Sequence, residues 1–80
     1  MSLDEAIKTR INEYLVERNL NLTQLSIISN LTPSTLFSLM DKDRKHPKII
    51  TIKKVCSGLG ITLSEFFDRD YFNNDDETYE

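Results

Sequence analysis

Six basic residues lie between positions 42 and 54 of this 80-residue chain, with a single acid, Asp43, among them. The segment therefore carries a local charge of +5, and clustered cations of this kind are suited to binding phosphate groups. The net charge of −3 conceals the cluster, because residues 70–80 contain five acids and no Lys or Arg, whereas residues 1–69 sum to +2. The acidic average thus does not exclude a nucleic-acid partner.

Residue types that catalyse reactions are sparse. Cys56 is the only cysteine, which excludes an internal disulfide and a cysteine-based zinc site. It falls on the inward face of a predicted helix, where a cysteine usually acts as a small core residue. His46, the only histidine, lies in the basic segment, where contact with solvent or phosphate suits it better than the role of a base. With no glycine-rich phosphate loop and no carboxylate cluster before the acidic end, we predict no enzyme, cofactor, metal or small-molecule ligand.

Residues 21–40 contain two short helical patterns separated by a brief break. Asn21 is a predicted N-cap of the first helix, and Thr32 with Pro33 at N1 begins the second. Asn30 stands where a left-handed residue would close the first helix. Apolar residues recur at helical spacing in both segments, namely Leu22, Leu25 and Ile28, then Leu36 and Leu39.

Two short helices joined in this way cross steeply and need a small residue where they approach. Ser26 supplies it, and Leu31 and Leu36 supply the apolar wedge that fixes the angle. This order of residues predicts a helix-turn-helix. The alternative is a small helical bundle with one tight turn and no DNA.

The flanking sequence predicts three further helices and one loop. Capping boxes at Ser2–Glu5 and Thr62–Glu65 begin the first and last helices, and the first should end near Arg18–Asn19. Residues 41–48 are polar, contain a proline and form a loop. The fourth helix runs from about Ile49 to Leu59, and Gly60 is its left-handed terminator.

We therefore predict an all-α, five-helix domain over residues 1–69 and an acidic tail over residues 70–80 that frays. The stripe Leu3, Ile7, Ile11, Tyr14 and Leu15 faces inward on the first helix, as Ile49 does on the fourth, and charged residues of the first helix such as Arg10 are solvated. The predicted core is Leu15, Leu25, Ile28, Leu31, Leu36, Leu39, Ile52, Val55, Leu59, Ile61, Leu63 and Phe66. With no apolar run of about 18 residues and no export leader, we expect a cytoplasmic protein without membrane contact.

From about Ile7 to Asp68 the sequence resembles the XRE family of phage-repressor and Cro-like DNA-binding domains. The matching motifs are Leu25-Ser26, Asn30-Leu31-Thr32, Ser34-Thr35-Leu36, Pro47 and the segment 59–67. Two positions depart from the family pattern: Leu22 replaces a frequent Gln, and Met40 a frequent Glu. The resemblance implies a five-helix lambda-repressor-like (Cro-like) fold, double-stranded DNA as partner and a bacterial or prophage origin.

In a helix-turn-helix the second helix enters the major groove, with its N-terminal residues at base edges. The predicted base contacts are Pro33, Ser34, Thr35, Phe37 and Ser38, although Phe37 can equally join the core or a dimer contact. Thr35 can bond a base, or its methyl can simply pack. The predicted phosphate contacts are Thr23, Gln24, Lys42, Arg44, Lys45 and Lys48, with Lys53 and Lys54 solvated.

One such domain presents little surface for tight specific binding, so we expect a homodimer on a pseudo-palindrome with half-sites roughly 34 Å apart. The dimer candidates are Phe66, Phe67, Tyr71 and Phe72; alternatively, these aromatics close the domain's own core. The predicted function is a sequence-specific transcriptional regulator, most simply a repressor that acts by occupying an operator. The alternative is an antitoxin-like or anti-repressor protein-interaction module that keeps the fold with weak or no DNA binding.

Overall fold

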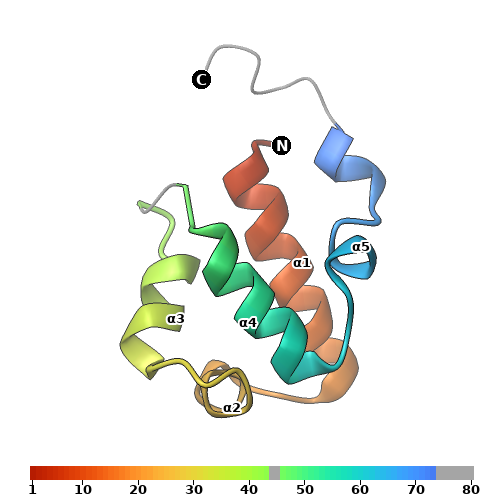
Figure 1. Cartoon of the computed structure of the whole chain (residues 1–80). Coiled ribbons are helices and arrows are strands. Elements are labelled where there is room, and N and C mark those ends of the chain that lie inside the picture. Colours follow the sequence, from red (N-terminus) through yellow and green to blue (C-terminus); the bar gives the residue numbers. More distant parts are fainter. Residues whose placement is uncertain (44–45, 74–80) are drawn as a thin grey trace.

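The computed structural model describes residues 1–43 and 46–73, and every regular element within these ranges is helical. Arg44, Lys45 and residues 74–80 lie outside the described residues. The predicted all-α class and the five predicted helices are confirmed (Figure 1). The elements are α1 (Leu3–Arg18), α2 (Leu22–Ile28), α3 (Pro33–Met40), α4 (Ile49–Leu59), α5 (Leu63–Phe66) and a 3-10 helix η1 (Asp70–Asn73).

The helices pack so that α2 contacts both α3 and α4, α4 contacts α5, and α1 contacts η1. In Figure 1, α3 and α5 lie on opposite sides of α4, and α2 is seen along its axis at the lower end. Within residues 1–43 and 46–73, no helix has the length and apolar character needed to cross a membrane.

The helix ends follow the capping residues in the sequence. Ser2 and Thr62 each form the predicted capping box: the hydroxyl accepts a bond from the amide three residues on, and the glutamate at that position accepts a bond from the cap amide. Asn21 caps α2 in the same way, with Gln24 as its partner. Gly60 ends α4 in the left-handed conformation, with φ of 72°. Local chemistry therefore determines where these helices start and stop.

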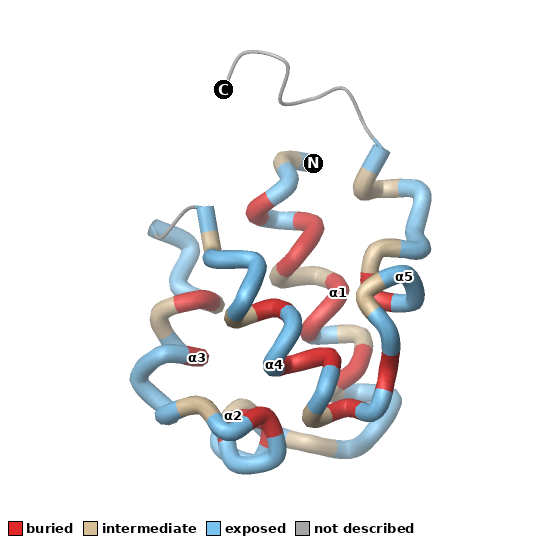
Figure 2. The backbone as a smooth tube through the Cα atoms, in the orientation of Figure 1, coloured by how far each residue is buried: buried red, intermediate tan, exposed pale blue. Residues whose placement is uncertain are grey.

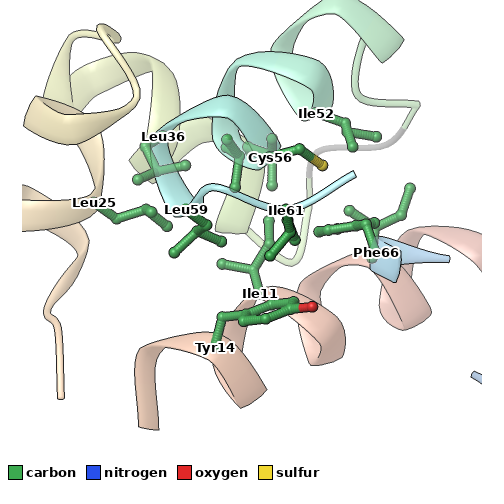
Figure 3. Packing of buried hydrophobic residues seen from close by; sticks show 12 residues of the cluster. Ile11, Tyr14, Leu25, Leu36, Ile52, Cys56, Leu59, Ile61 and Phe66 are labelled. Carbon is green, nitrogen blue, oxygen red and sulfur yellow. The ribbon is translucent and has the colours of Figure 1, made fainter. Parts of the chain in front are cut away.

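Apolar side chains from all five α-helices and the α4–α5 connection form a single core (Figures 2 and 3). Leu15, Leu31 and Leu63 are half-buried and pack against it. Burial raises the pKa of the Cys56 thiol, consistent with its predicted role as a small core residue. Of the predicted core, the buried members are Leu25, Leu36, Leu39, Ile52, Val55, Leu59, Ile61 and Phe66, and α1 adds Ala6, Ile7, Ile11 and Tyr14.

Three residues predicted to face inward are exposed. Leu3 and Ile49 each stand at the first position of their helix, beyond the edge of the core. Ile28 is exposed because α4 approaches the Ile28 backbone: a Cβ on Gly58 would lie 2.6 Å from the Ile28 carbonyl oxygen. The absence of a side chain at Gly58 therefore lets α2 and α4 meet through their main chains.

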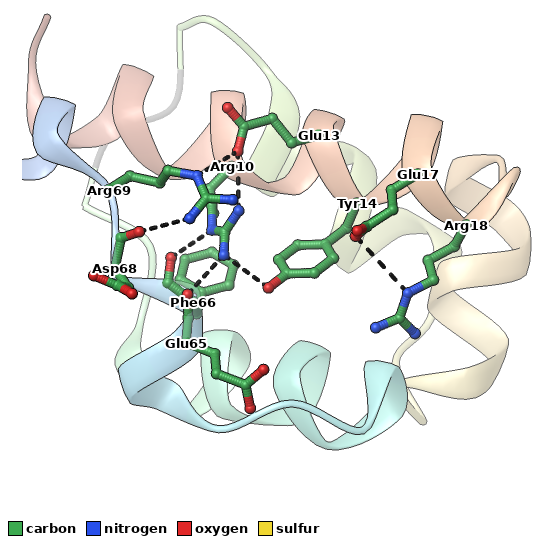
Figure 4. Close-up of polar contacts among 9 residues, drawn as sticks. All are labelled: Arg10, Glu13, Tyr14, Glu17, Arg18, Glu65, Phe66, Asp68 and Arg69. Carbon is green, nitrogen blue, oxygen red and sulfur yellow. Dashed lines mark hydrogen bonds and ion pairs between the residues drawn. The ribbon is translucent and has the colours of Figure 1, made fainter.

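Arg10 is buried, with only 4% of its surface exposed, so the prediction that it is solvated is wrong. Its Nε donates to the Phe66 carbonyl oxygen at 2.7 Å and its Nη2 to the Glu65 carbonyl oxygen at 2.6 Å. Nη2 also donates to the Tyr14 hydroxyl at 2.8 Å, and Nη1 pairs with Glu13 at 3.0 Å (Figure 4). These bonds hold the end of α5 against α1.

The aromatic residues at the C-terminal end of the domain pack on one another. Ring centroids of Phe66 and Phe67, and of Phe67 and Phe72, lie 5.0 Å apart. Tyr71 and Phe72 belong to η1, so residues 70–73, predicted to be part of the fraying tail, are helical. Because Phe66 is fully buried, its prediction as a dimer contact is wrong, whereas Phe67 and Phe72 are half-buried and pack against the core.

Replacing Arg10 by methionine should lower the free energy of unfolding by about 2–4 kcal/mol, because it leaves two carbonyl oxygens of α5 and Glu13 without their charged donor. Urea denaturation followed by circular dichroism measures this change. Arg69→Met is the matched control: Arg69 pairs with the same Glu13 carboxylate at 3.6 Å but is about half exposed, so its loss should cost under about 1 kcal/mol. Equal losses of unfolding free energy in the two variants would contradict the role of Arg10 in holding α5 against α1.

Tyr71 should make the protein lose stability in alkali. Burial, and then the neighbouring Glu13 carboxylate, raise the pKa of Tyr71 from 10 to about 12. The folded state thus favours the neutral phenol, and this contribution is complete below pH 10 and is lost as the pH rises through about 12. Between these pH values Tyr71→Phe should lose less stability than wild type in urea titrations, and parallel losses would contradict this assignment.

Candidate nucleic-acid interface

The segment 21–40 folds as the predicted helix-turn-helix. Asn30 adopts the left-handed conformation with φ of 57°, and the Leu31 amide donates to the Ser26 carbonyl oxygen at 2.9 Å. Ser26 and Leu36 are fully buried, as their proposed roles at the crossing require. The turn therefore fixes α3 relative to α2 with one face of α3 directed away from the core.

The exposed face of α3 carries two parallel rows of side chains. Pro33 and Phe37 form one row and Ser34 and Ser38 the next, because residues four apart lie above one another on a helix. Pro33, Ser34, Thr35 and Phe37 are exposed and Ser38 is half-buried. Thr35 lies beside the cap, with its hydroxyl 2.8 Å from that of Thr32. All five predicted base-contact residues thus have accessible surface on one helix.

Phe37 is 51% exposed and does not belong to the core cluster. Of the three roles considered for it, membership of the core is therefore excluded. A base contact and a dimer contact remain.

The beginning of α2 presents Thr23 and Gln24, both exposed. Gln24 accepts the Asn21 amide through Oε1 at 2.9 Å, and this capping bond does not use the side-chain NH2 group, which is a donor. Leu22 and Met40, the two departures from the family pattern, are half-buried and pack against the core. At both positions the chain therefore uses an apolar contact where the family often has a polar residue.

The loop after α3 brings cations next to that helix. Lys42 and Lys48 are exposed, and Lys48 lines a surface pocket together with Thr35 and Ser38 of α3. Arg44 and Lys45, the other two predicted loop contacts, lie outside the described residues. Because residues 41–48 also contain Asp41 and Asp43, their net charge is +2, while α3 itself has no charged side chain.

Two side chains of α1 hold this loop in place. The buried carboxylate of Asp4 accepts the His46 amide at 2.7 Å, and Lys8 Nζ donates to the Asp41 carbonyl oxygen at 2.8 Å. His46 has φ of 61°, an uncommon conformation for a residue with a side chain. Sequence reasoning missed both anchors. Asp4 in particular gave no signal, since an acid in the first turn of a helix is ordinarily explained by the helix dipole.

A helix-turn-helix with an uncharged, exposed second helix and cations beside it is the arrangement expected of a DNA-binding domain. In agreement, residues 10–70 match the family model described as the Cro/C1-type HTH (helix-turn-helix) DNA-binding domain. The chain belongs to this family, and the resemblance seen in its sequence is confirmed.

A solved structure has a similar fold. The crystal structure of the prophage Lp1 protein 11 is similar to this chain with a TM-score of 0.79 and 31% sequence identity, over 89% of this chain and 93% of that chain. A comparison with curated proteins gave no match. The lambda-repressor-like fold predicted from the sequence is therefore confirmed by a structural relative as well as by the family model.

Asp4→Ala should release the loop, because it leaves the His46 amide without its acceptor. The expected loss of unfolding free energy is about 1–3 kcal/mol, together with faster hydrogen exchange of the His46 amide measured by NMR. Asp4→Asn is the matched control, since its amide oxygen can still accept the bond. If His46 exchanges equally fast in both variants, the carboxylate does not anchor the loop.

Proposed function

We propose that this protein is a sequence-specific DNA-binding transcriptional regulator, most simply a repressor that occupies an operator. The exposed face of α3 is the observation that carries the proposal. Its hydroxyls and apolar groups are uncharged, so α3 can enter the major groove without removing a charged side chain from water. Membership of a DNA-binding family supports it, and similarity to a prophage protein supports a prophage origin. We propose no catalytic role for the protein, and we propose that it acts in the cytoplasm, where it meets its DNA.

In this proposal the two parts of the surface act differently. Ser34 and Ser38 bond base edges and are compatible with several bases, because a hydroxyl both donates and accepts. Phosphates are bound by the loop cations, the Thr23 and Gln24 side chains and the amides at the start of α2. Affinity then comes largely from the DNA backbone, and DNA shape adds to specificity.

We further propose that the protein binds as a homodimer to a pseudo-palindrome with half-sites roughly 34 Å apart. A single domain of this size buries too little surface for tight specific binding. Phe67, Tyr71 and Phe72 are half-buried, so each keeps part of its surface for a second copy. Sedimentation of the protein alone and with a two-half-site duplex tests this assembly.

A protein-interaction module is the second candidate. The net charge of −3 and the exposed side chains of Ile27 and Ile50, at 71% and 57%, favour it, since exposed apolar residues are suited to protein contacts. This candidate predicts high affinity for a protein and indifference to DNA.

The deciding experiment measures binding to random duplex DNA across a salt series. Lys42→Ala/Lys48→Ala should weaken binding and reduce the slope of log K against log salt by about 1.8, because each lost phosphate contact removes roughly 0.9. Lys53→Ala/Lys54→Ala is the matched control: it removes the same charge from exposed sites on α4 and should leave the slope unchanged.

Three outcomes separate the candidates. A reduced slope in the loop variant alone supports phosphate binding beside α3. Equal reductions in both variants would mean that only the overall charge matters, which contradicts the proposed interface. If wild type does not bind duplex DNA even at low salt, the regulator proposal fails and the protein-interaction module takes its place.

A further inference from the structure

We infer that α3 selects its DNA through the C5-methyl groups of pyrimidines in the major groove, with Phe37 as the residue that contacts them. The inference rests on the proposed function and names the chemistry that the exposed face of α3 recognises. Its ligand is a C5-methylpyrimidine, which means thymine in unmodified DNA and 5-methylcytosine in methylated DNA.

Phe37 differs from the other phenylalanines of the chain. Phe66 is fully buried, and Phe67 and Phe72 pack against the core and against each other. Phe37 instead leaves 51% of its surface in water, so folding provides only about half of the stabilisation that a fully buried aromatic ring contributes. This ring is therefore available for an apolar partner outside the domain.

The composition of α3 leaves the discrimination between bases to this ring. Bidentate contacts to guanine or adenine require Arg, Lys, Asn or Gln, and the helix, PSTLFSLM, contains none of them. The row of Ser34 and Ser38 can bond most base edges. The neighbouring row of Pro33 and Phe37 is apolar, and the C5-methyl of a pyrimidine is the apolar group that the major groove presents.

The position of Phe37 suits such a contact. It lies in the middle of the eight-residue helix α3, one turn after Pro33, and so follows directly on the N-terminal turn whose residues reach base edges in a recognition helix. The hydroxyl row lies directly beside it, so a single base step can receive a hydrogen bond from one row and an apolar contact from the other. Burying one methyl group is worth about four-fold in affinity.

The test begins with duplexes enriched by wild-type protein from a random library. One enriched duplex is resynthesised with uracil in place of thymine at single positions, which removes only the methyl group. We expect at least one position where wild type loses about four-fold in affinity. Phe37→Ala should lose less than about two-fold at that position, whereas Phe37→Leu, which retains an apolar side chain, should keep part of the effect.

A second arm distinguishes the two sources of the methyl group. At the sensitive position a C·G pair is compared with a 5-methylcytosine·G pair; wild type should gain affinity from the methyl group and Phe37→Ala should not. Ile27→Ala, which shortens an exposed apolar residue on α2, is the matched control and should respond to both changes as wild type does. Circular dichroism verifies that each variant is folded.

Several results would overturn the inference. If uracil changes no position, or lowers the affinity of wild type and Phe37→Ala equally, Phe37 does not contact a methyl group. If Phe37→Ala also weakens self-association in sedimentation, Phe37 is a dimer contact. Enrichment without sensitivity to methyl groups refutes this inference alone, whereas failure of wild type to bind any duplex refutes the proposed function with it.

Discussion

The close approach of α2 to its two neighbours is the constraint on which the presentation of α3 depends. On one side the fully buried Ser26 and the left-handed Asn30 let α3 follow after a brief turn. On the other side Gly58 allows the α4 backbone to lie against the Ile28 carbonyl, where any Cβ would collide at 2.6 Å. Small residues thus allow the main chains to approach at both contacts, and these contacts determine the orientation of α3.

Polar bonds from α1 supplement this apolar packing. Arg10 ties the end of α5 to α1, and Asp4 and Lys8 tie the loop after α3 to the same helix. The bonds of Arg10 and Asp4 are buried or half-buried. Solvent competes least for them there, and leaving one partner unpaired would cost the most folding free energy. One helix therefore sets both the C-terminal end of the domain and the loop that carries the cations.

The sequence predicted those features that depend on local chemistry. The caps at Ser2, Asn21 and Thr62 and the left-handed Asn30 and Gly60 were all found as predicted, because each depends on one or two neighbouring residues. The apolar period likewise identified most of the core. The helix-turn-helix and its exposed face could therefore be located without a structure.

Features that depend on distant partners could not be predicted. Arg10 lies at the edge of the apolar stripe of α1, where its charge favours solvent, and only the carbonyls of α5, some 55 residues away in sequence, explain its burial. The same is true of Asp4, whose partner His46 is 42 residues away. Ile28 was predicted to be buried and is exposed. It follows the apolar period of α2, but α4 contacts its backbone and not its side chain. Periodicity reports one helix at a time and carries no information on which partner approaches it, or by which atoms.

The separation of charge from the exposed face of α3 has a physical consequence for recognition. Cations in the loop act over several ångströms and on any sequence, so they provide affinity that falls with salt. Hydroxyls and an apolar ring on α3 act only on contact, and their contribution is nearly independent of salt. In a domain built this way, raising the salt concentration should weaken all DNA binding while leaving the ratio between good and poor sequences almost unchanged. A charged recognition helix would instead mix the two contributions, because each arginine that reads a base also attracts the neighbouring phosphates.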